Sequence, residues 1–174
     1  MQRYPDTFEL ASTVDDIQRI VMSGKVASMM GVEGGYSIEN ELGNLQRLYD
    51  EGCRYMTLTH SRSLSWADSA SDEPVSHGLS QFGHEVILEM NRLGMLIDLS
   101  HVSQETMKAA LAATQAPVVF SHSSARAICD HPRNVPDDVL TLVAENGGVV
   151  MVNFYSAFIV PTDQLKFDRE ARGT

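Results

Sequence analysis

Four polar residues of the sequence each follow a short apolar run that has the character of a buried strand. Glu33 follows the run ending at Val32, and His60, His101 and His122 end three later runs. Such runs are typical of strands in a parallel sheet, whose carboxyl ends meet at one edge. A histidine at a single strand end is more often structural than functional, but four polar residues at four strand ends should face one mouth. Glutamate with two histidines suits zinc or a similar divalent metal, so the pattern indicates a metal centre.

The remaining histidines and one aspartate have less direct interpretations. His77, His84 and His131 fall in predicted loops or on a predicted helix, and we interpret them as surface residues. Asp98 lies three residues before His101, inside a predicted strand. Two roles stay open for Asp98: it orients a ligand histidine from behind the metal, or it is a buried, hydrogen-bonded carboxylate.

Helical patterns separate the predicted strands. Between the strands that end at His101 and His122, Ser103 is a predicted N-cap of a helix that continues to Thr114. We expect further helices over residues 13–23, 40–51, 81–93, 136–146 and 162–172, a helical turn over 123–128, and strands over 26–32, 54–60, 95–101, 117–123 and 149–155. The polar segment 61–80 is predicted to be a long loop that serves as a lid, a binding loop or a disordered insert. Strands alternating with helices indicate an α/β fold with a parallel sheet.

The missing nucleotide motifs favour a barrel over an open sheet. No Gly-x-Gly-x-x-Gly follows a strand, and no Gly-Lys-Ser/Thr phosphate loop is present. A complete eight-stranded barrel takes roughly 250 residues, whereas the 174 residues here contain five predicted strands. We therefore predict a partial TIM-like (β/α)8 barrel with about five central βα units. Residues 1–174 would form a single incomplete domain that lacks the N-terminal strands and the last strand of the barrel.

Composition excludes some partners and indicates a compartment. The net charge of −10 argues against nucleic-acid binding, which needs clustered Lys and Arg. We find neither an apolar run of about 18 residues nor a basic-then-apolar N-terminus, so no membrane segment or signal peptide is visible. Cys53 and Cys129 are predicted to be buried free thiols, and we expect a cytoplasmic protein.

Five blocks in a fixed order carry a family resemblance. They are VEGGYSI at 32–38, LTH at 58–60, IDLSH at 97–101, FSHSSA at 120–125 and RNVPDD at 133–138. Together they resemble the signature of the membrane (renal) dipeptidase family, the M19 metallopeptidases. The resemblance covers about residues 4–158, with Cys53 as a small departure where the family usually has an aliphatic residue.

The resemblance implies a dipeptidase with two Zn²⁺ ions per complete active site on a barrel of the metallo-dependent hydrolase type. Members of the family often tolerate a D-residue at the C-terminal position of the dipeptide, so the resemblance implies this tolerance as well. By this resemblance Glu33 bridges the metals, His101 and His122 complete one metal shell, and His60 contacts substrate and the developing oxyanion. Arg133 would bind the substrate carboxylate, although the sequence alone would place it in a solvated loop. A bridging water would attack the peptide carbonyl.

Two parts of the family pattern are missing from this sequence. No His-x-Asp motif for the first metal occurs, and the aspartate expected several tens of residues after Phe158 is absent. We therefore expect one metal shell at best, and an isolated chain that is inactive or poorly folded. Two other classes stay open: another amidohydrolase-type enzyme acting on a cyclic amide or lactone, and a non-catalytic remnant that serves as a binding module. A homodimer of the full-length parent and the preferred dipeptide also stay open.

Overall fold

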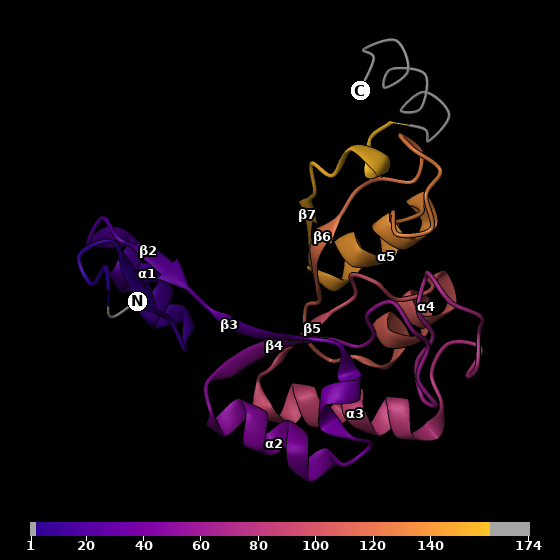
Figure 1. The fold of residues 1–174 in the computed structure, drawn as a ribbon, viewed down its shortest axis with the longest axis horizontal. Coiled ribbons are helices and arrows are strands. Elements are labelled where there is room, and N and C mark those ends of the chain that lie inside the picture. Colours follow the sequence, from indigo (N-terminus) through magenta and orange to yellow (C-terminus); the bar gives the residue numbers. More distant parts are fainter. Residues whose placement is uncertain (1–2, 161–174) are drawn as a thin grey trace.

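The computed structural model describes residues 3–160 (Figure 1). Its strands are β1 (Phe8–Leu10), β2 (Val26–Ser28), β3 (Met30–Glu33), β4 (Cys53–Thr57), β5 (Leu96–Asp98), β6 (Val119–Ser123) and β7 (Val149–Val152). Its α-helices are α1 (Val14–Met22), α2 (Leu42–Asp50), α3 (Gln81–Leu93), α4 (Gln104–Ala113) and α5 (Asp137–Asn146). Two 3-10 turns cover Gly35–Ile38 and Ser156–Phe158. The helix predicted over 162–172 lies outside the described residues.

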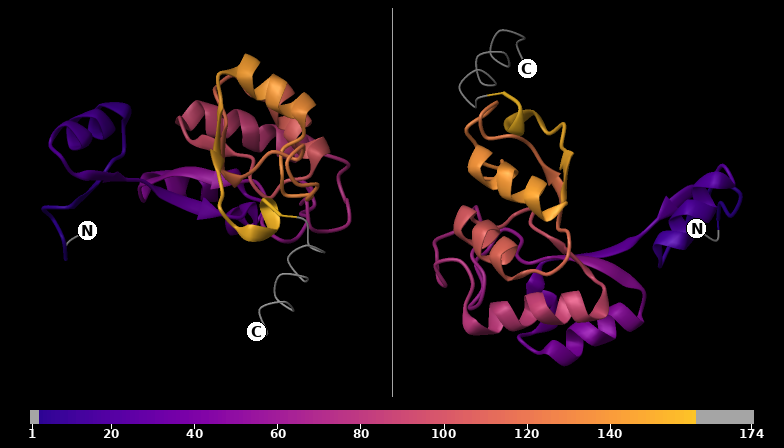
Figure 2. Two further views of the ribbon diagram at one scale, coloured as in Figure 1. Left: turned by 90° about the horizontal axis from the view of Figure 1, so that it is seen from above. Right: turned by 180° about the vertical axis from the view of Figure 1, so that it is seen from behind.

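Strands β3 to β7 form one parallel five-stranded sheet in which neighbours along the chain are also neighbours in space. A helix, from α2 to α5, lies between each pair of successive strands in the chain. Figures 1 and 2 show these helices following the strands around one side of the sheet. A doubly wound sheet would reverse its strand order at a switch point, whereas this order is consecutive. The fold is therefore the partial TIM-like barrel that the sequence predicts.

The first strands form a small unit apart from the sheet. Strand β1 pairs in parallel with β2, helix α1 connects them, and the unit lies to one side of the molecule (Figure 1). The prediction of one strand over 26–32 is wrong, because its first half pairs with β1 and only its second half joins the larger sheet. Thr13 is the N-cap of α1, in a capping box with Asp16. The Arg54 side chain, through Nε, donates to the Ser12 carbonyl at 2.8 Å and ties this unit to β4.

Several predicted elements are longer than those observed. Strand β4 ends at Thr57 and β5 ends at Asp98, so His60 and His101 each lie three residues beyond their strand. Strand β7 ends at Val152, short of the predicted residue 155. The helical turn predicted over 123–128 is shorter in the structure: a turn covers residues 126–128, with the Ile128 N–H donating to the Ala125 carbonyl at 3.1 Å, while Ala125 pairs with Val135 in an isolated bridge. After β4, β5 and β7 the chain therefore leaves the sheet earlier than the sequence predicts and continues as loops.

The core lies between the sheet and its helices. Met56, Ile97 and Phe120 of the strands are at most 1% exposed. The helices contribute Leu45, Val86, Ile87, Met90, Met107, Ala110, Val139 and Val143 to the same cluster. Ser103 caps α4 by accepting from the Thr106 N–H at 3.2 Å, as predicted. Helices α2 to α5 thus pack on the strands whose carboxyl ends carry the site residues.

The other face of the sheet is largely uncovered. A hollow of about 420 Å³ on this face is lined by Met29, Tyr55, Leu96, Val119 and Met151, among others. Leu96 of β5 and Met151 of β7 both line this hollow and are 38% and 49% exposed. In a closed barrel this face is the interior, so its exposure agrees with a partial barrel.

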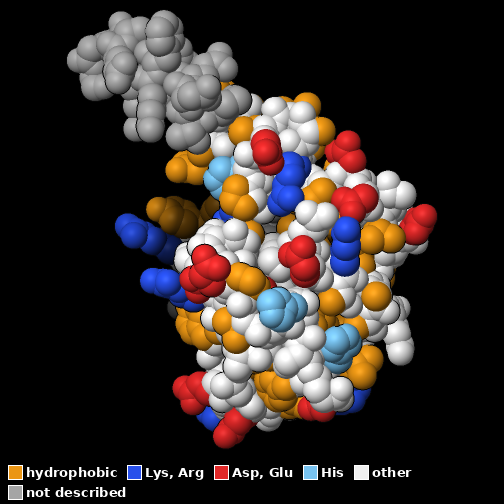
Figure 3. Space-filling view, turned by 90° about the vertical axis from the view of Figure 1, so that its right-hand side faces the viewer, with side chains coloured by type: hydrophobic (Ala, Val, Ile, Leu, Met, Phe, Trp, Pro, Cys, Tyr) orange, Lys and Arg blue, Asp and Glu red, His pale blue; other side chains and the backbone are white. Residues whose placement is uncertain are grey.

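Charged side chains of both signs are spread over the face shown in Figure 3. Acidic and basic side chains are scattered there between uncharged areas, with no continuous basic patch on the coloured part. Cys53 and Cys129 are buried and free, as the sequence predicts.

Candidate metal centre

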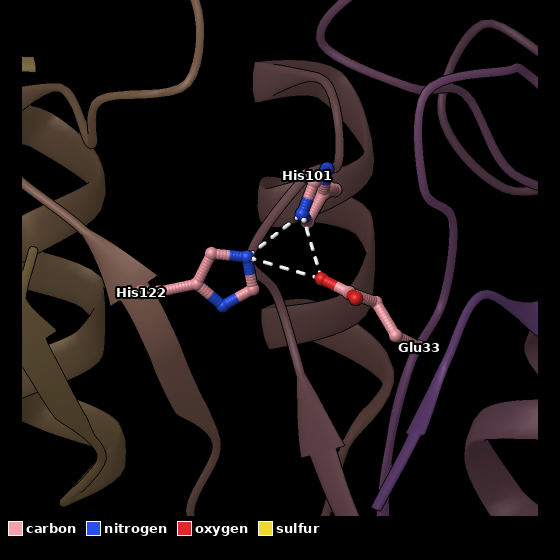
Figure 4. A group of neighbouring side chains, drawn as sticks. All are labelled: Glu33, His101 and His122. Carbon is pink, nitrogen blue, oxygen red and sulfur yellow. Dashed lines mark hydrogen bonds and ion pairs between the residues drawn. The ribbon is translucent and has the colours of Figure 1, made fainter. Parts of the chain in front are cut away.

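Three side chains from the carboxyl ends of β3, β5 and β6 converge at one edge of the sheet, with β4 between the first two of these strands. Glu33 is the last residue of β3, His101 follows β5, and His122 lies in β6. One Glu33 carboxylate oxygen, Oε1, lies 3.1 Å from His101 Nε2 and 3.3 Å from His122 Nε2. The two Nε2 atoms are 2.7 Å apart (Figure 4). The structure thus brings together the three residues predicted as metal ligands.

The local backbone explains how Glu33 and His101 reach this position. After Glu33 the chain turns sharply through Gly34, which has a φ of 114°, a value that favours glycine. His101 has a φ of 74°, in the left-handed region that non-glycine residues seldom adopt. This turn brings the His101 ring, whose residue is 7% exposed, back over the end of the sheet. Backbone strain of this kind is often found at functional sites.

The electrostatics of the two histidines suit metal binding. Burial, assisted by Arg133, His122 and His60, lowers the pKa of His101 to about 3. Burial and Arg133 also lower the pKa of His122. Both rings are therefore neutral near pH 7, which is the form that coordinates a metal. Ser121 Oγ lies 2.7 Å from His122 Nδ1, so an Nδ1–H donated to this hydroxyl leaves the Nε2 lone pair facing the other ligands.

The donor set passes a simple test for a cation. The ligand atoms of Glu33, His101 and His122 all lie within 4.8 Å of one another. A carboxylate oxygen and two imidazole nitrogens each present a lone pair to the same point, and the group does not supply a hydrogen for every lone pair. A divalent cation at that point would accept all three lone pairs. One carboxylate oxygen and two imidazole nitrogens are typical zinc ligands.

His60 lies at the edge of this group and is more accessible. Its Nε2 is 4.0 Å from Glu33 Oε1, and its ring centroid is 4.4 Å from that of His101. Its side chain is 44% exposed, compared with 8% for His101. His60 is therefore placed to meet a molecule that enters the mouth, while the other two histidines lie deeper.

Arg133 is buried, so the placement in a solvated loop that the sequence alone favoured is wrong. The residue is 8% exposed, its Nη2 donates to the His122 carbonyl at 3.2 Å, and Cζ lies 5.2 Å from the Phe158 ring centroid. Burial lowers the pKa of Arg133 to about 10, against the opposite effect of Glu33 and Asp98. It remains charged near pH 7. Arg133 Nε has no hydrogen-bond partner within residues 3–160, so donor capacity is left for an anionic ligand.

His131 is less exposed than the surface position that the sequence predicts. It was interpreted as a surface histidine, but it is only partly exposed, and its ring centroid lies 4.8 Å from that of Phe158. His131 Nδ1 accepts a hydrogen bond from the Arg133 N–H at 3.1 Å. The chain between β6 and α5 therefore folds on itself around Arg133, which the sequence shows only as a polar connection. His77 is exposed, as expected, and His84 is half-buried on α3.

Asp98 is fully buried, and its contacts favour one of its two open roles. Its Oδ1 accepts from the Ser100 and Ser121 N–H groups, both at 3.0 Å. These bonds join the ends of β5 and β6. No hydrogen bond from Asp98 to a histidine ring is present in the described part of the chain. The geometry therefore favours a buried, hydrogen-bonded carboxylate over direct orientation of a ligand histidine.

Comparison with known proteins identifies the family. The family model described as membrane dipeptidase (peptidase family M19) matches residues 1–171. The chain belongs to the M19 membrane dipeptidase family. An uncharacterized dipeptidase of Schizosaccharomyces pombe is 49% identical over 159 residues, covering 91% of this chain and 39% of the relative. Dipeptidase verJ of Clonostachys rogersoniana is 46% identical over 164 residues, covering 94% of this chain and 42% of the relative.

Solved structures show the same fold. The probable dipeptidase PvdM from Pseudomonas aeruginosa has a TM-score of 0.88 at 29% identity, covering 99% of this chain and 46% of that one. A metallo peptidase from Rhodobacter sphaeroides, liganded with a phosphinate mimic of the dipeptide L-Ala-D-Ala, has a TM-score of 0.82 at 26% identity, covering 90% of this chain and 46% of that one. The M19 chain described here thus spans about two fifths of the length of its curated relatives. Among residues 3–160, none of the helices is long and apolar enough to cross a membrane.

Proposed function

We propose that the protein carrying this M19 chain is a zinc-dependent dipeptidase. The observation that supports this proposal most directly is the convergence of Glu33 Oε1, His101 Nε2 and His122 Nε2 at the mouth of the barrel. Membership of a dipeptidase family adds the reaction class. These three residues would hold the metal, with Glu33 shared between two zinc ions in a complete active site. The ligands of the second ion would come from outside the three residues gathered here.

The chemistry of the site fits hydrolysis of a peptide bond. A zinc ion, when bound, lowers the pKa of a coordinated water and polarises a carbonyl group. The chain itself supplies the groups that hold the substrate. His60, half-exposed beside the triad, would donate a hydrogen bond to the carbonyl oxygen as negative charge develops there. The buried ring of His101 and the partly buried ring of His122 would limit water on the inner side of the site.

Arg133 would select for a free carboxylate. Its guanidinium lies against the His122 carbonyl, close enough to the triad to affect the pKa of both histidines. A planar guanidinium can bind both carboxylate oxygens, and one buried next to the site would recognise the C-terminal group of a dipeptide. Selection for a free carboxylate one residue beyond the scissile bond would make the enzyme an exopeptidase that releases a C-terminal residue, and the restriction to dipeptides would follow from the family.

We also propose that the substrates include dipeptides with a C-terminal D-residue. The Rhodobacter sphaeroides relative, described with a mimic of L-Ala-D-Ala, supports this extension. A carboxylate held by Arg133 fixes the end of the substrate and leaves the C-terminal side chain free to point either way. The structure of residues 3–160 contains one ligand triad and an uncovered inner face, so we propose that residues 1–174 by themselves are inactive.

The test is hydrolysis of L-L and L-D dipeptides by the intact protein with added zinc, beside a chelated sample. We expect zinc-dependent cleavage, and its loss by at least 100-fold in a His122→Ala variant, since a metal ligand is removed. His84→Ala, which changes a histidine outside the triad, is the matched control and should keep its activity. Equal activity with and without the chelator, or in His122→Ala, would contradict the proposal.

A further inference from the structure

The loop between β4 and α3, which the sequence predicts to be a lid, a binding loop or a disordered insert, is held in one conformation by hydrogen bonds of buried residues. Its buried residue Asp68 accepts hydrogen bonds from the N–H groups of Val75, Ser76 and Gly78 at 2.6, 2.8 and 2.6 Å. The Asp68 carbonyl accepts from the Ser103 N–H at 2.8 Å. One end of the loop is thus fastened to its own later residues and to the start of α4.

Ser69, the residue after Asp68, contacts the backbones of His60 and His101. Ser69 is 2% exposed, and its Oγ donates to the His60 carbonyl at 2.7 Å, with the His101 carbonyl at 3.3 Å as a second acceptor. The next N–H group, that of Ala70, donates to the His101 carbonyl at 2.7 Å. The Oγ atom also accepts from the Ser71 N–H at 3.2 Å. One hydroxyl therefore joins the backbones of two histidines that belong to different strands.

The carbonyl of His101 belongs to a residue whose backbone conformation depends on hydrogen bonds from its surroundings. Its backbone has the left-handed φ of 74°, and this conformation turns the ring toward Glu33 and His122. A residue held in this region persists only where the surrounding contacts enforce it. Two consecutive loop residues, Ser69 and Ala70, supply those contacts from outside the sheet.

We propose that Ser69 is a positioning residue for the metal centre. Its hydroxyl holds the backbones of His60 and His101 in place, and so sets the distance of the His101 ring from the other ligands. The role rests on the proposed metal site, but not on the identity of the substrate. Without the hydroxyl, the His60 carbonyl loses its short hydrogen bond and the His101 turn keeps only the bond from Ala70. The ligands would then spread over more positions, and the metal would bind less tightly.

The experiment compares Ser69→Ala with Ser71→Ala in the intact, zinc-free protein. Ser71 lies in the same loop, but its side chain is exposed and makes no hydrogen bond within the described residues, so it is the matched control. Zinc affinity is measured by competition with a chelator, and the visible spectrum of bound Co²⁺ reports the ligand geometry. We expect about a 10-fold loss of zinc affinity and a changed Co²⁺ spectrum for Ser69→Ala, at the low end of the range for groups that support metal ligands.

Zinc affinity within twofold of wild type in Ser69→Ala, with an unchanged Co²⁺ spectrum, would overturn the role. Weakened zinc binding supports it even if wild type cleaves no dipeptide, so the two proposals fail separately. If Ser69→Ala is unfolded, Ser69→Cys replaces it, since a thiol nearly keeps the size and is a weak donor. We expect an intermediate loss of zinc affinity for Ser69→Cys, and wild-type affinity there would overturn the role as well.

Discussion

Replacement of Asp68 by Asn should destabilise the protein far more than its near-identical shape suggests. The carboxylate of Asp68 accepts three backbone N–H groups, two on Oδ1 and that of Gly78 on Oδ2. An amide keeps one oxygen for the first two donors but turns its NH₂ group toward the Gly78 N–H. A hydrogen bond to a charged group contributes about 1.5–3 kcal/mol, and Gly78 is buried where water cannot replace it. We expect a loss of about 2 kcal/mol for Asp68→Asn.

The assay is urea unfolding of the zinc-free protein, with Glu73→Gln as control. Glu73 is an exposed carboxylate of the same loop, and its side chain makes no hydrogen bond within residues 3–160, so its free energy of unfolding should change by less than about 0.5 kcal/mol. Asp68→Ala removes all three hydrogen bonds, and the free energy of unfolding should fall by about 3–5 kcal/mol. The loss is smaller than three full bonds to a charged group, because water can partly replace the bonds to the Val75 and Ser76 N–H groups. A change below about 0.5 kcal/mol for Asp68→Asn would refute the idea that its carboxylate anchors the loop.

The same carboxylate predicts a pH dependence. Burial by itself would raise the pKa of Asp68, but the N–H groups of Ser76, Gly78 and Val75 outweigh it and lower the pKa below its usual value. A group whose pKa is lower in the folded state stabilises that state above its unfolded pKa, about 3.9 for Asp, and this contribution is lost as the pH falls through the lowered pKa. The stability difference between wild type and Asp68→Asn should therefore be constant from pH 5 to 7 and shrink below about pH 4. A difference that stays constant down to pH 2 would contradict this assignment.

Two further changes test the site itself. Gly35→Ala would place a Cβ 2.4 Å from the Leu58 carbonyl oxygen and 2.5 Å from a Trp66 ring carbon, and because the first of these is backbone, we expect a loss of about 2–3 kcal/mol in thermal or urea unfolding. Stability equal to wild type would show that the turn after Glu33 is looser than the structure indicates. Arg133→Lys keeps the charge but not the planar fork, so KM for a dipeptide should rise at least 10-fold while a C-terminal amide analogue is little affected. An unchanged KM in steady-state kinetics would instead favour an amidohydrolase-type reaction that needs no free carboxylate.

Local patterns in the sequence determine much of the scaffold and the metal triad. Apolar runs, helical spacing and the N-cap Ser103 predict helices and the five strands of the sheet, because these signals act between residues close in the chain. Parallel strands must end at the same edge, so the convergence of Glu33, His101 and His122 could be predicted without knowing a single contact.

Tertiary structure alone decides which of these segments pair and what surrounds the triad. The split of the predicted strand 26–32 depends on β1, whose short sequence has no clear strand pattern. The burial of Arg133 depends on Phe158, which lies 25 residues later, and the hydrogen bond from Ser69 to the His101 carbonyl joins residues 32 apart. Such contacts depend on two distant segments meeting in space, which the periodicity of neither segment encodes. The sequence by itself thus determined which residues meet as proposed ligands, whereas only the folded chain decided how they are held.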